Sequence, residues 1–327
     1  MKAMVCPEIN EDVGVLRLED VPVRDPGPGE IRVTLRAASV NFPDILMIQG
    51  KYQFKPPLPF SPGMEGAGVV NAVGAGVTTV REGDAVVTGA RFGTFAEQIV
   101  VPAEAVRPKP ERLSFEEAAA YPAAYLTAYV ALVRRGGLQA GDTLLVHGAS
   151  GGVGLAALDL SKVLGATVIA TTGRPEKMDA LRAAGADHVL PAPGFREAVK
   201  DLTGGRGADV IYDPVGGDVF DESVRCIAFD GRLLVVGFTS GRIPSVSVNM
   251  PLIKGFSVVG VRAGEYGRVF PDRGRENVAA VDALAAEGRI RPRVDSVHPL
   301  GDAVAAMRRL LNRQVVGKVV LTTAQAA

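Results

Sequence analysis

The chain has 327 residues, of which 47% are hydrophobic and 22% charged, so it has the length of two domains and enough apolar surface to fold. Its 36 basic residues balance 36 acidic ones, and we therefore expect no nucleic-acid partner and no membrane-surface partner. Cys6 and Cys226 are too few for a disulfide framework, which predicts a reducing, cytoplasmic setting. The sequence has no signal-like N-terminus and no long apolar run, so we expect a soluble protein.

The N-terminal part of the chain is predicted to be a compact, barrel-like β unit. Short β-type runs at 31–35, 68–70 and 85–87 are separated by glycine and proline. Prolines are too dense for regular structure between Pro22 and Pro28 and between Pro56 and Pro62, so both stretches are expected to be loops.

From about Tyr121 the pattern changes to helical segments that alternate with short apolar strands, which is typical of βαβ units around a parallel sheet. Leu155 to Leu164 is the predicted first crossover helix, with Gly165 as its C-terminal stop. Pro175 suits the first turn of the next helix, and Gly185 ends that helix. The expected strands are 143–146, 167–170, 210–212, 232–236 and 256–261, and near the end of the chain helices at 281–286 and 304–311 precede a closing strand at 318–321.

A glycine-rich turn directly after the first of these strands predicts a dinucleotide site. In this context Gly151 permits a tight turn, Gly152 lets the backbone approach a pyrophosphate, and Gly154 allows close packing of the helix. The helix N-terminus adds free N–H groups and the positive end of the helix dipole. Ala149 departs from the usual pattern because a glycine is common there. The predicted phosphate contacts are Ser150, Gly151, Gly152, Val153 and Gly154.

The end of the second parallel strand indicates NADPH rather than NADH. Thr172 stands where an NAD site usually has a carboxylate, which would bind the ribose and repel a 2′-phosphate. Thr172 and Gly173 leave space, and Arg174 and Lys177 bring positive charge. The alternative is that these two cations are ordinary solvated charges at a helix end.

Several motifs together resemble the zinc-free quinone oxidoreductase (zeta-crystallin-like) family of the medium-chain dehydrogenase/reductase superfamily. They are Ser39–Asp44, Gly50–Tyr52, Pro59–Gly68, Leu126–Tyr129 and the glycine turn, in that order along the chain. The resemblance implies an α/β protein in which a GroES-like catalytic domain, residues 1–122 rejoined by 263–327, accompanies a Rossmann NADPH-binding domain with a doubly wound parallel sheet at 123–262.

The resemblance also implies that no metal takes part. Asn41 and Met64 match the positions at which zinc-dependent relatives carry a catalytic Cys and a His, and the four-Cys lobe of those relatives is missing near residues 90–115. The histidines, His147, His188 and His298, are too scattered to supply a zinc site. We expect His147 at the end of a buried strand and the other two in loops.

By the same resemblance, three residues are candidates for catalytic roles. Asn41 would lie near the nicotinamide ribose and the substrate, Tyr52 would donate a hydrogen bond to the acceptor oxygen, and Thr127 would face the nicotinamide. The alternatives are a loop-stabilising turn for Asn41 and a packed aromatic for Tyr52. Further cofactor contacts are implied for Val215, Gly237, Phe238, Thr239 and Lys318. The Tyr that often binds the 2′-phosphate in the family is replaced near Pro191.

Without a metal to polarise a carbonyl, hydride transfer requires an acceptor that is already electron-poor, so a quinone or conjugated carbonyl is the expected substrate. An enoyl-thioester or 2-haloacrylate reductase on the same scaffold is the first alternative, because substrate choice lies in loops. A noncatalytic NADPH-binding or RNA-binding crystallin-like protein is the second alternative.

A homodimer is predicted, because the apolar strand at 256–261 would otherwise lie unpaired at a sheet edge.

Overall fold

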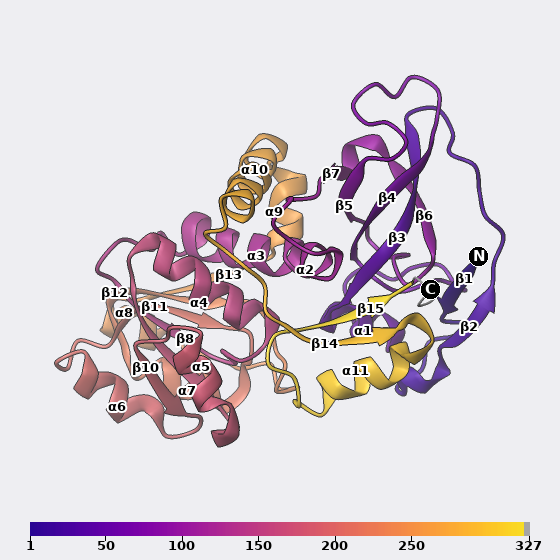
Figure 1. Cartoon of the computed structure of the whole chain (residues 1–327). Helices are drawn as coiled ribbons and strands as arrows, with labels where there is room; N and C mark the ends of the chain where they lie inside the picture. Colours follow the sequence, from indigo (N-terminus) through magenta and orange to yellow (C-terminus); the bar gives the residue numbers. More distant parts are fainter. Residues whose placement is uncertain (324–327) are drawn as a thin grey trace. The chain divides into compact units, whose positions relative to one another are not determined.

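The computed structural model describes residues 1–323 and divides the chain into two compact units (Figure 1). The first unit contains Met1–Ala123 and resumes at Arg291, and the second contains Ala124–Ile290. The chain therefore returns to the first unit later than residue 263, the expected point. Residues 263–290 form helices of the second unit, where Arg134 donates a hydrogen bond to Asn277 at 2.7 Å and pairs with Glu276 at 2.7 Å.

The first unit is built around a seven-stranded sheet, which agrees with the GroES-like expectation. Six of its strands follow the order β14-β15-β3-β4-β5-β7, and β6 pairs with β3. The closing strand β15 lies antiparallel to β3, with Val319 opposite Val40, so the last strand of the described residues joins the sheet that begins with β3, while β1 and β2 form a separate two-stranded sheet. The strands are β1 Lys2–Val5, β2 Arg17–Asp20, β3 Glu30–Val40, β4 Glu65–Val73, β5 Ala85–Gly89, β6 Gln98–Pro102, β7 Val106–Pro108, β14 Val294–Pro299 and β15 Lys318–Thr322.

Helices close the core of the first unit at the end of β3 and beside β15. Ile45, Met47 and Ile48 of α1 are buried in one cluster with Met307 of α11 and Leu321 of β15. Figure 1 shows α11 running alongside β14 and β15. The helical segments are η1 Val13–Val15, α1 Phe42–Ile48, η2 Ala103–Ala105, α2 Phe115–Ala120, η5 Leu300–Asp302 and α11 Ala303–Leu311. This packing anchors α1 in the core of the first unit.

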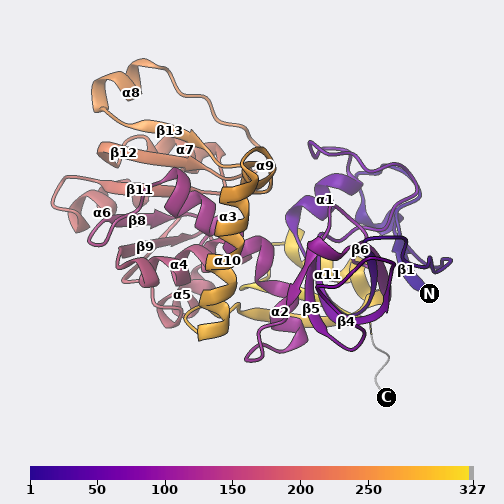
Figure 2. The same cartoon turned by 90° about the horizontal axis from the view of Figure 1, so that it is seen from above.

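The second unit is a parallel six-stranded sheet with the order β10-β9-β8-β11-β12-β13, as Figure 2 shows from β13 down to β9. From β8 the chain moves outward to β9 and β10, then returns to β11 and moves the other way, which is the doubly wound arrangement. Right-handed crossovers therefore place α4 and α5 on one face and α6 and α7 on the other. The strands are β8 Thr143–Val146, β9 Thr167–Thr172, β10 His188–Pro191, β11 Ala208–Asp213, β12 Ile227–Val235 and β13 Ser257–Gly260.

Two glycine stops predicted for the helices of the second unit are confirmed. Gly165 ends α4 with φ 77°, and Gly185 follows α5 with φ 92°, a region that glycine enters without strain. The helical segments are α3 Pro122–Tyr129, the π-helix η3 Val130–Arg135, α4 Gly152–Leu164, η4 Pro175–Lys177, α5 Met178–Ala183, α6 Phe195–Leu202, α7 Gly217–Ser223, α8 Asn249–Lys254, α9 Ala263–Val269 and α10 Pro271–Glu287.

Two histidines are not where the sequence placed them. His188 begins β10 and His298 lies in β14, because the apolar residues beside each, Val189-Leu190 and Val297, pair into parallel ladders.

Among residues 1–323, no helix is both long and apolar enough to cross a membrane.

Candidate active site

Asn41 lies at the junction where β3 ends and α1 begins. The helix starts at Phe42 with a proline in its first turn, and Asn41 is its N-cap. Asp44, in the same turn, accepts a hydrogen bond from the backbone N–H of Asn41 at 2.8 Å. Its other carboxylate oxygen accepts the N–H of Gly63 at 3.2 Å. Asp44 therefore holds the backbone of Asn41 against the loop that leads into β4.

The Asn41 side chain belongs to a buried polar cluster with Glu65 and Lys318. Asn41 Nδ2 donates to Glu65 Oε1 at 2.9 Å, and Lys318 Nζ donates to Asn41 Oδ1 at 2.6 Å. Lys318 and Glu65 form an ion pair at 3.0 Å, with side chains only 7% and 2% exposed. Glu65 Oε2 also accepts the N–H of Ala123 at 2.7 Å. The two charges compensate each other, which a buried ion pair requires.

The electrostatics of this cluster act on Asp44 as well. The pKa of the Asp44 carboxyl is raised to about 7, first by burial and to a smaller extent by the negative charge of Glu65. The hydrogen bonds from the backbone of Asn41 and Gly63 and the positive charge of Lys318 act in the opposite direction. A buried carboxyl thus titrates near neutral pH directly behind the Asn41 backbone.

Tyr52 lies beyond the other end of α1. The chain leaves the helix through Gly50, whose φ is 66°, and the Tyr52 N–H donates to Leu46 O at 3.2 Å. The Tyr52 ring is partly buried and packs against the core cluster that α1 helps to form, as Met64 does. The packed-aromatic interpretation therefore describes the ring, and a role for the hydroxyl stays a prediction.

In the second unit, the predicted cofactor residues lie in segments that follow parallel strands. The glycine turn follows β8, residues 172–177 end or follow β9, Val215 follows β11, and residues 237–239 follow β12. Because these strands are parallel, their carboxyl ends meet at one edge of the sheet, where nucleotides bind in doubly wound folds. Thr127 is half-buried on α3.

The glycine turn shows the close packing predicted at Gly154 but not the tight bend predicted at Gly151. A Cβ on Gly154 would lie 2.6 Å from Gly148 O and 2.7 Å from Ala149 Cα, so only glycine fits there. Gly151, in contrast, has φ −78° at the N-cap of α4, an ordinary conformation. The residue with positive φ is Gly148, at 54°, so the tight bend comes three positions earlier than expected.

The two cations after β9 differ in exposure. Thr172 Oγ1 accepts the N–H of Arg174 at 3.2 Å, which turns the chain away from the strand. The Arg174 side chain is 50% exposed and lies 3.9 Å from Glu176. Lys177 is buried, with 6% exposure. Arg174 is the more accessible of the two to a phosphate.

The segments after β11 and β12 interlock. Asp213 Oδ1 accepts the N–H groups of Val215 and Gly216 at 2.8 and 2.9 Å, and Pro214 O accepts the N–H of Thr239 at 3.0 Å. Burial raises the pKa of the Asp213 carboxyl against these two hydrogen bonds. Val215 and the 237–239 segment are therefore brought together, and their contact with a cofactor stays a prediction.

His147 is structural, as expected. It directly follows β8 and is fully buried, with Nδ1 2.8 Å from Thr171 Oγ1 and Nε2 2.8 Å from Ser223 Oγ. Burial lowers the pKa of the imidazole to about 3. The ring is thus neutral and is held by two hydroxyls.

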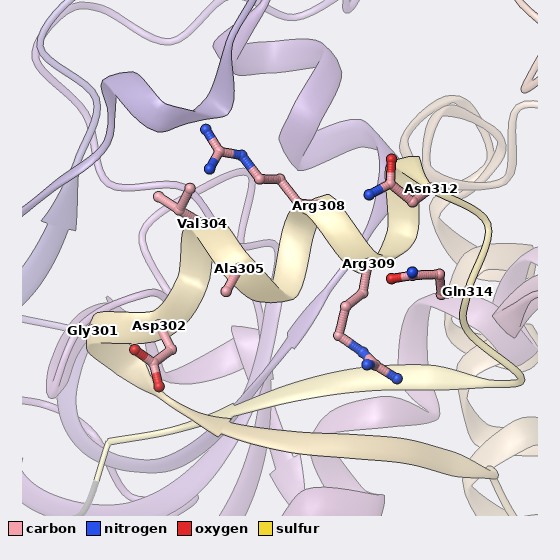
Figure 3. A pocket seen from close by; sticks show the side chains of 8 residues that line it. All are labelled: Gly301, Asp302, Val304, Ala305, Arg308, Arg309, Asn312 and Gln314. Atoms are coloured by element: carbon pink, nitrogen blue, oxygen red, sulfur yellow. The ribbon is translucent and has the colours of Figure 1, made fainter.

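Two further observations concern metal and anion binding. Within residues 1–323, no group of three or more His, Cys, Asp or Glu side chains could hold a metal ion. An open hollow of about 420 Å³ runs along α11 (Figure 3). Its two arginines point in different directions, and Arg308 pairs with Asp12 at 3.2 Å while Arg309 pairs with Asp295 at 3.0 Å. Because both arginines are paired with carboxylates, the hollow offers little net positive charge to an anion.

A GroES-like unit joined to a Rossmann sheet with this glycine turn is the architecture of the medium-chain dehydrogenase/reductase superfamily. Residues 27–111 match the alcohol dehydrogenase GroES-like domain family and residues 152–283 match the zinc-binding dehydrogenase family. The chain is 38% identical to quinone oxidoreductase-like protein 2 of Mus musculus, covering 98% of this chain and 92% of that protein. The chain belongs to the quinone oxidoreductase-like family of this superfamily and is an oxidoreductase.

Solved structures agree with this assignment. A mycobacterial protein in complex with NADPH superposes with a TM-score of 0.91 at 34% identity, covering 99% of this chain and 100% of that one. The quinone oxidoreductase of Escherichia coli, also in complex with NADPH, superposes with a TM-score of 0.90 at 30% identity, covering 99% and 100%.

Sequence reasoning missed the roles of Glu65 and Asp44. Both stand inside motifs that carried the family resemblance, but no role was predicted for either. The available signal for Glu65 is a single acid in an otherwise uncharged run, Pro62 to Val70, at the point where β4 begins. An acid at the start of an apolar strand must be paired or bonded when it is buried.

Proposed function

We propose that this chain is a metal-independent, NADPH-dependent reductase that transfers hydride to a quinone. The observation that carries the proposal is the state of Asn41, which by resemblance occupies the position of a catalytic zinc ligand. Its amide is bonded to an ammonium and a carboxylate, the Lys318–Glu65 pair. An amide between these two charges suits hydrogen bonding to an organic ligand rather than coordination of zinc, which prefers thiolate and imidazole.

The second unit supplies the proposed cofactor site. Gly154 leaves room that a Cβ would fill, and the first N–H groups of α4 have no acceptor within the helix. Bound there, NADPH supplies the hydride. The residues proposed to hold it in this unit are Thr127, Ser150, Gly151, Gly152, Val153, Gly154, Thr172, Gly173, Arg174, Lys177, Val215, Gly237, Phe238 and Thr239.

The preference for a 2′-phosphate rests on Arg174. The end of β9 carries a threonine in place of a carboxylate, and Arg174 is half exposed directly after it. A guanidinium can bind a phosphate with two parallel hydrogen bonds. Lys177, being buried, contributes positive potential rather than a direct contact.

In the first unit, Asn41, Lys318 and Tyr52 are proposed to serve the substrate and the nicotinamide. Negative charge develops on the acceptor oxygen during reduction, and a positioned donor that strengthens with this charge lowers the barrier. Tyr52 is the proposed donor to the acceptor oxygen. Asn41 orients the reacting partners, and the Lys318 ammonium stabilises negative charge nearby.

The test is an NADPH-oxidation screen of the purified protein. Acceptors are 1,4-benzoquinone, 1,2-naphthoquinone, 9,10-phenanthrenequinone, simple enones and enoyl thioesters, each assayed before and after extended dialysis against a strong chelator. Quinone turnover that survives the chelator is the expected result. Turnover confined to enones or enoyl thioesters would assign the substrate differently, and tight NADPH binding with no turnover would indicate a binding protein.

We also propose a homodimer that forms through β13. Within the described residues β13 pairs only with β12, so its other edge offers unpaired backbone groups. Beside it, Phe229, Leu252 and Ile253 are 80%, 83% and 71% exposed, which is unusual for large apolar side chains. Light scattering at micromolar concentration tests the oligomeric state, and a monomer would contradict the proposal.

The free, buried thiols Cys6 and Cys226 favour a reducing, cytoplasmic setting.

A further inference from the structure

We propose that Glu65 is the positioning residue of the candidate active site, and that together with Lys318 it locks the Asn41 amide in one orientation. This inference rests on the proposed function, because it explains how Asn41 is made ready for its role. In this proposal Glu65 does not contact cofactor or substrate itself and acts by holding the Asn41 amide.

The chemistry of the two neighbours leaves Asn41 one orientation. A carboxylate only accepts hydrogen bonds and an ammonium only donates them. Asn41 Nδ2 faces Glu65 Oε1 at 2.9 Å and Asn41 Oδ1 faces Lys318 Nζ at 2.6 Å. A flipped amide would set donor against donor and acceptor against acceptor at both contacts. The amide is therefore fixed from both ends.

Glu65 is itself held from several directions, so it can serve as a reference point. It is the first residue of β4, opposite Gly89 of β5, and its backbone carbonyl accepts Thr94 Oγ1 at 3.0 Å. Its second carboxylate oxygen accepts the N–H of Ala123, in the first turn of α3, at 2.7 Å. The carboxylate cannot rotate without losing that bond.

The lock leaves the second hydrogen of the Asn41 amide in the longer of its two hydrogen bonds. One Nδ2 hydrogen is committed to Glu65, and the other points to Ser39 O at 3.3 Å, a long contact. An ammonium that donates to the amide oxygen polarises the amide and strengthens its N–H groups as donors. The second hydrogen is thus the group that Asn41 can offer to a ligand, in a direction that Glu65 sets.

Glu65→Gln removes the charge while it keeps the shape of the side chain. The new amide must place its own NH₂ either toward Ala123 N–H or toward Asn41 and Lys318, so one donor opposes a donor in either case. Glu117→Gln is the matched control. Glu117 also accepts a backbone N–H, from Ser114 at 3.0 Å, and pairs with Arg291 at 2.7 Å, but it has no bond to Asn41.

The first measurement is independent of activity. Solvent exchange of the Asn41 side-chain amide hydrogens is followed by NMR on protein labelled with ¹⁵N-asparagine, the signal being assigned by its loss in Asn41→Ala. Exchange should be about 10-fold or more faster in Glu65→Gln than in the wild type and in Glu117→Gln, because a bonded hydrogen must open before it exchanges. Equal exchange rates in all three proteins would overturn the proposal.

The second measurement is a double-mutant cycle on kcat/KM for NADPH oxidation by a quinone. If Glu65 acts through Asn41, Glu65→Gln should lower kcat/KM about 10-fold alone but cause no further loss in an Asn41→Ala background. Additive losses would overturn the proposal, since a merely structural defect adds to any other. If the wild type turns over no acceptor, the proposed function fails while the exchange experiment still decides the positioning role.

A second variant covers the case in which Glu65→Gln does not fold. Glu65→Gln combined with Lys318→Met removes both charges together, which buried pairs tolerate better than the loss of one partner. This double variant should fold and show the same fast exchange of the Asn41 amide. Slow exchange in it would show that the pair does not hold the amide, and the proposal would be abandoned.

Discussion

The two units hold their buried polar groups in opposite ways. The first unit uses charges, with Glu65 and Lys318 paired inside the fold and Asp44 beside them. The second unit gives its buried groups neutral partners, with His147 between two hydroxyls and Asp213 bonded to the backbone N–H groups of Val215 and Gly216. A buried ion pair fixes its side chains, but the loss of one partner destabilises the fold strongly. A glycine turn at a helix N-terminus instead leaves backbone N–H groups and space that can accept a phosphate.

The largest effect is expected from breaking the ion pair of the first unit. Lys318→Met leaves the Glu65 carboxylate buried without its cation and should lower the free energy of unfolding by about 3–5 kcal/mol. Combined with Glu65→Gln, the loss should be much smaller, because no buried charge is left alone. Urea denaturation of the single and double variants measures both values. A double variant as unstable as Lys318→Met would contradict the charge argument.

The two units should respond to pH in opposite directions. The pKa of Asp44 is raised to about 7, so its contribution to stability is complete below pH 4 and is lost as the pH rises to 7. The pKa of His147 is lowered to about 3, so its contribution is complete above pH 6.5 and is lost as the pH falls.

Peptide-resolved hydrogen exchange at pH 5 and pH 7, corrected for the intrinsic exchange rate, separates the two units. In the wild type, α1 should be better protected at pH 5 and the β8–α4 region better protected at pH 7. Asp44→Asn should remove the first difference, and His147→Gln the second. If both regions gain protection at the same pH, the contrast between the units is wrong.

The glycine turn sharpens the comparison, because it is stabilised by close backbone packing rather than by charge. Gly154→Ala would bring a Cβ within 2.6 Å of Gly148 O, so the backbone must move, at a cost of about 1–3 kcal/mol. Gly151→Ala is the control, since its Cβ would lie 3.4 Å from the same oxygen and its φ is ordinary. Thermal unfolding should show a loss of stability for Gly154→Ala alone.

An exposed cation in the second unit should act on one cofactor and not on stability. Arg174→Ala should raise the KM for NADPH by an amount equivalent to about 1–3 kcal/mol while the KM for NADH stays nearly unchanged. Arg182→Ala, which removes an exposed arginine from α5 that is paired with Asp179, should change neither value. Equal losses for both cofactors in Arg174→Ala would refute the assignment of the 2′-phosphate.

The smallest effect concerns the hydroxyl of Tyr52. Tyr52→Phe should lower kcat and kcat/KM together by about 10-fold, because the lost hydrogen bond strengthens as charge develops. The dissociation constant of NADPH, measured by fluorescence titration, should not change. If quinone turnover is unaffected, Tyr52 is a packed aromatic only and the proton comes from solvent.

The sequence predicted the second unit better than the first. Parallel strands and glycine stops such as Gly165 are set by local residues, and a strand-to-helix glycine turn has one structural context. The cluster around Asn41 could not be predicted, because Glu65 and Lys318 meet only when β15 joins β3, and pairing over such a distance leaves no local pattern. The tight bend lies at Gly148 rather than at Gly151, and this depends on backbone angles that composition does not reveal.

The last strand of the first unit has a consequence for biosynthesis. Lys318 is 277 positions from Asn41, so a growing chain carries Asn41 and Glu65 long before their cation is made. Domains commonly fold in the order of synthesis, from the N-terminus onward. We therefore expect the N-terminal unit to reach its final packing only after Lys318 is made, whereas residues 124–290 already contain the whole sheet of the second unit. We expect a chain truncated before β15 to contain a folded second unit and an incompletely folded first unit, and proteases should cleave the first unit.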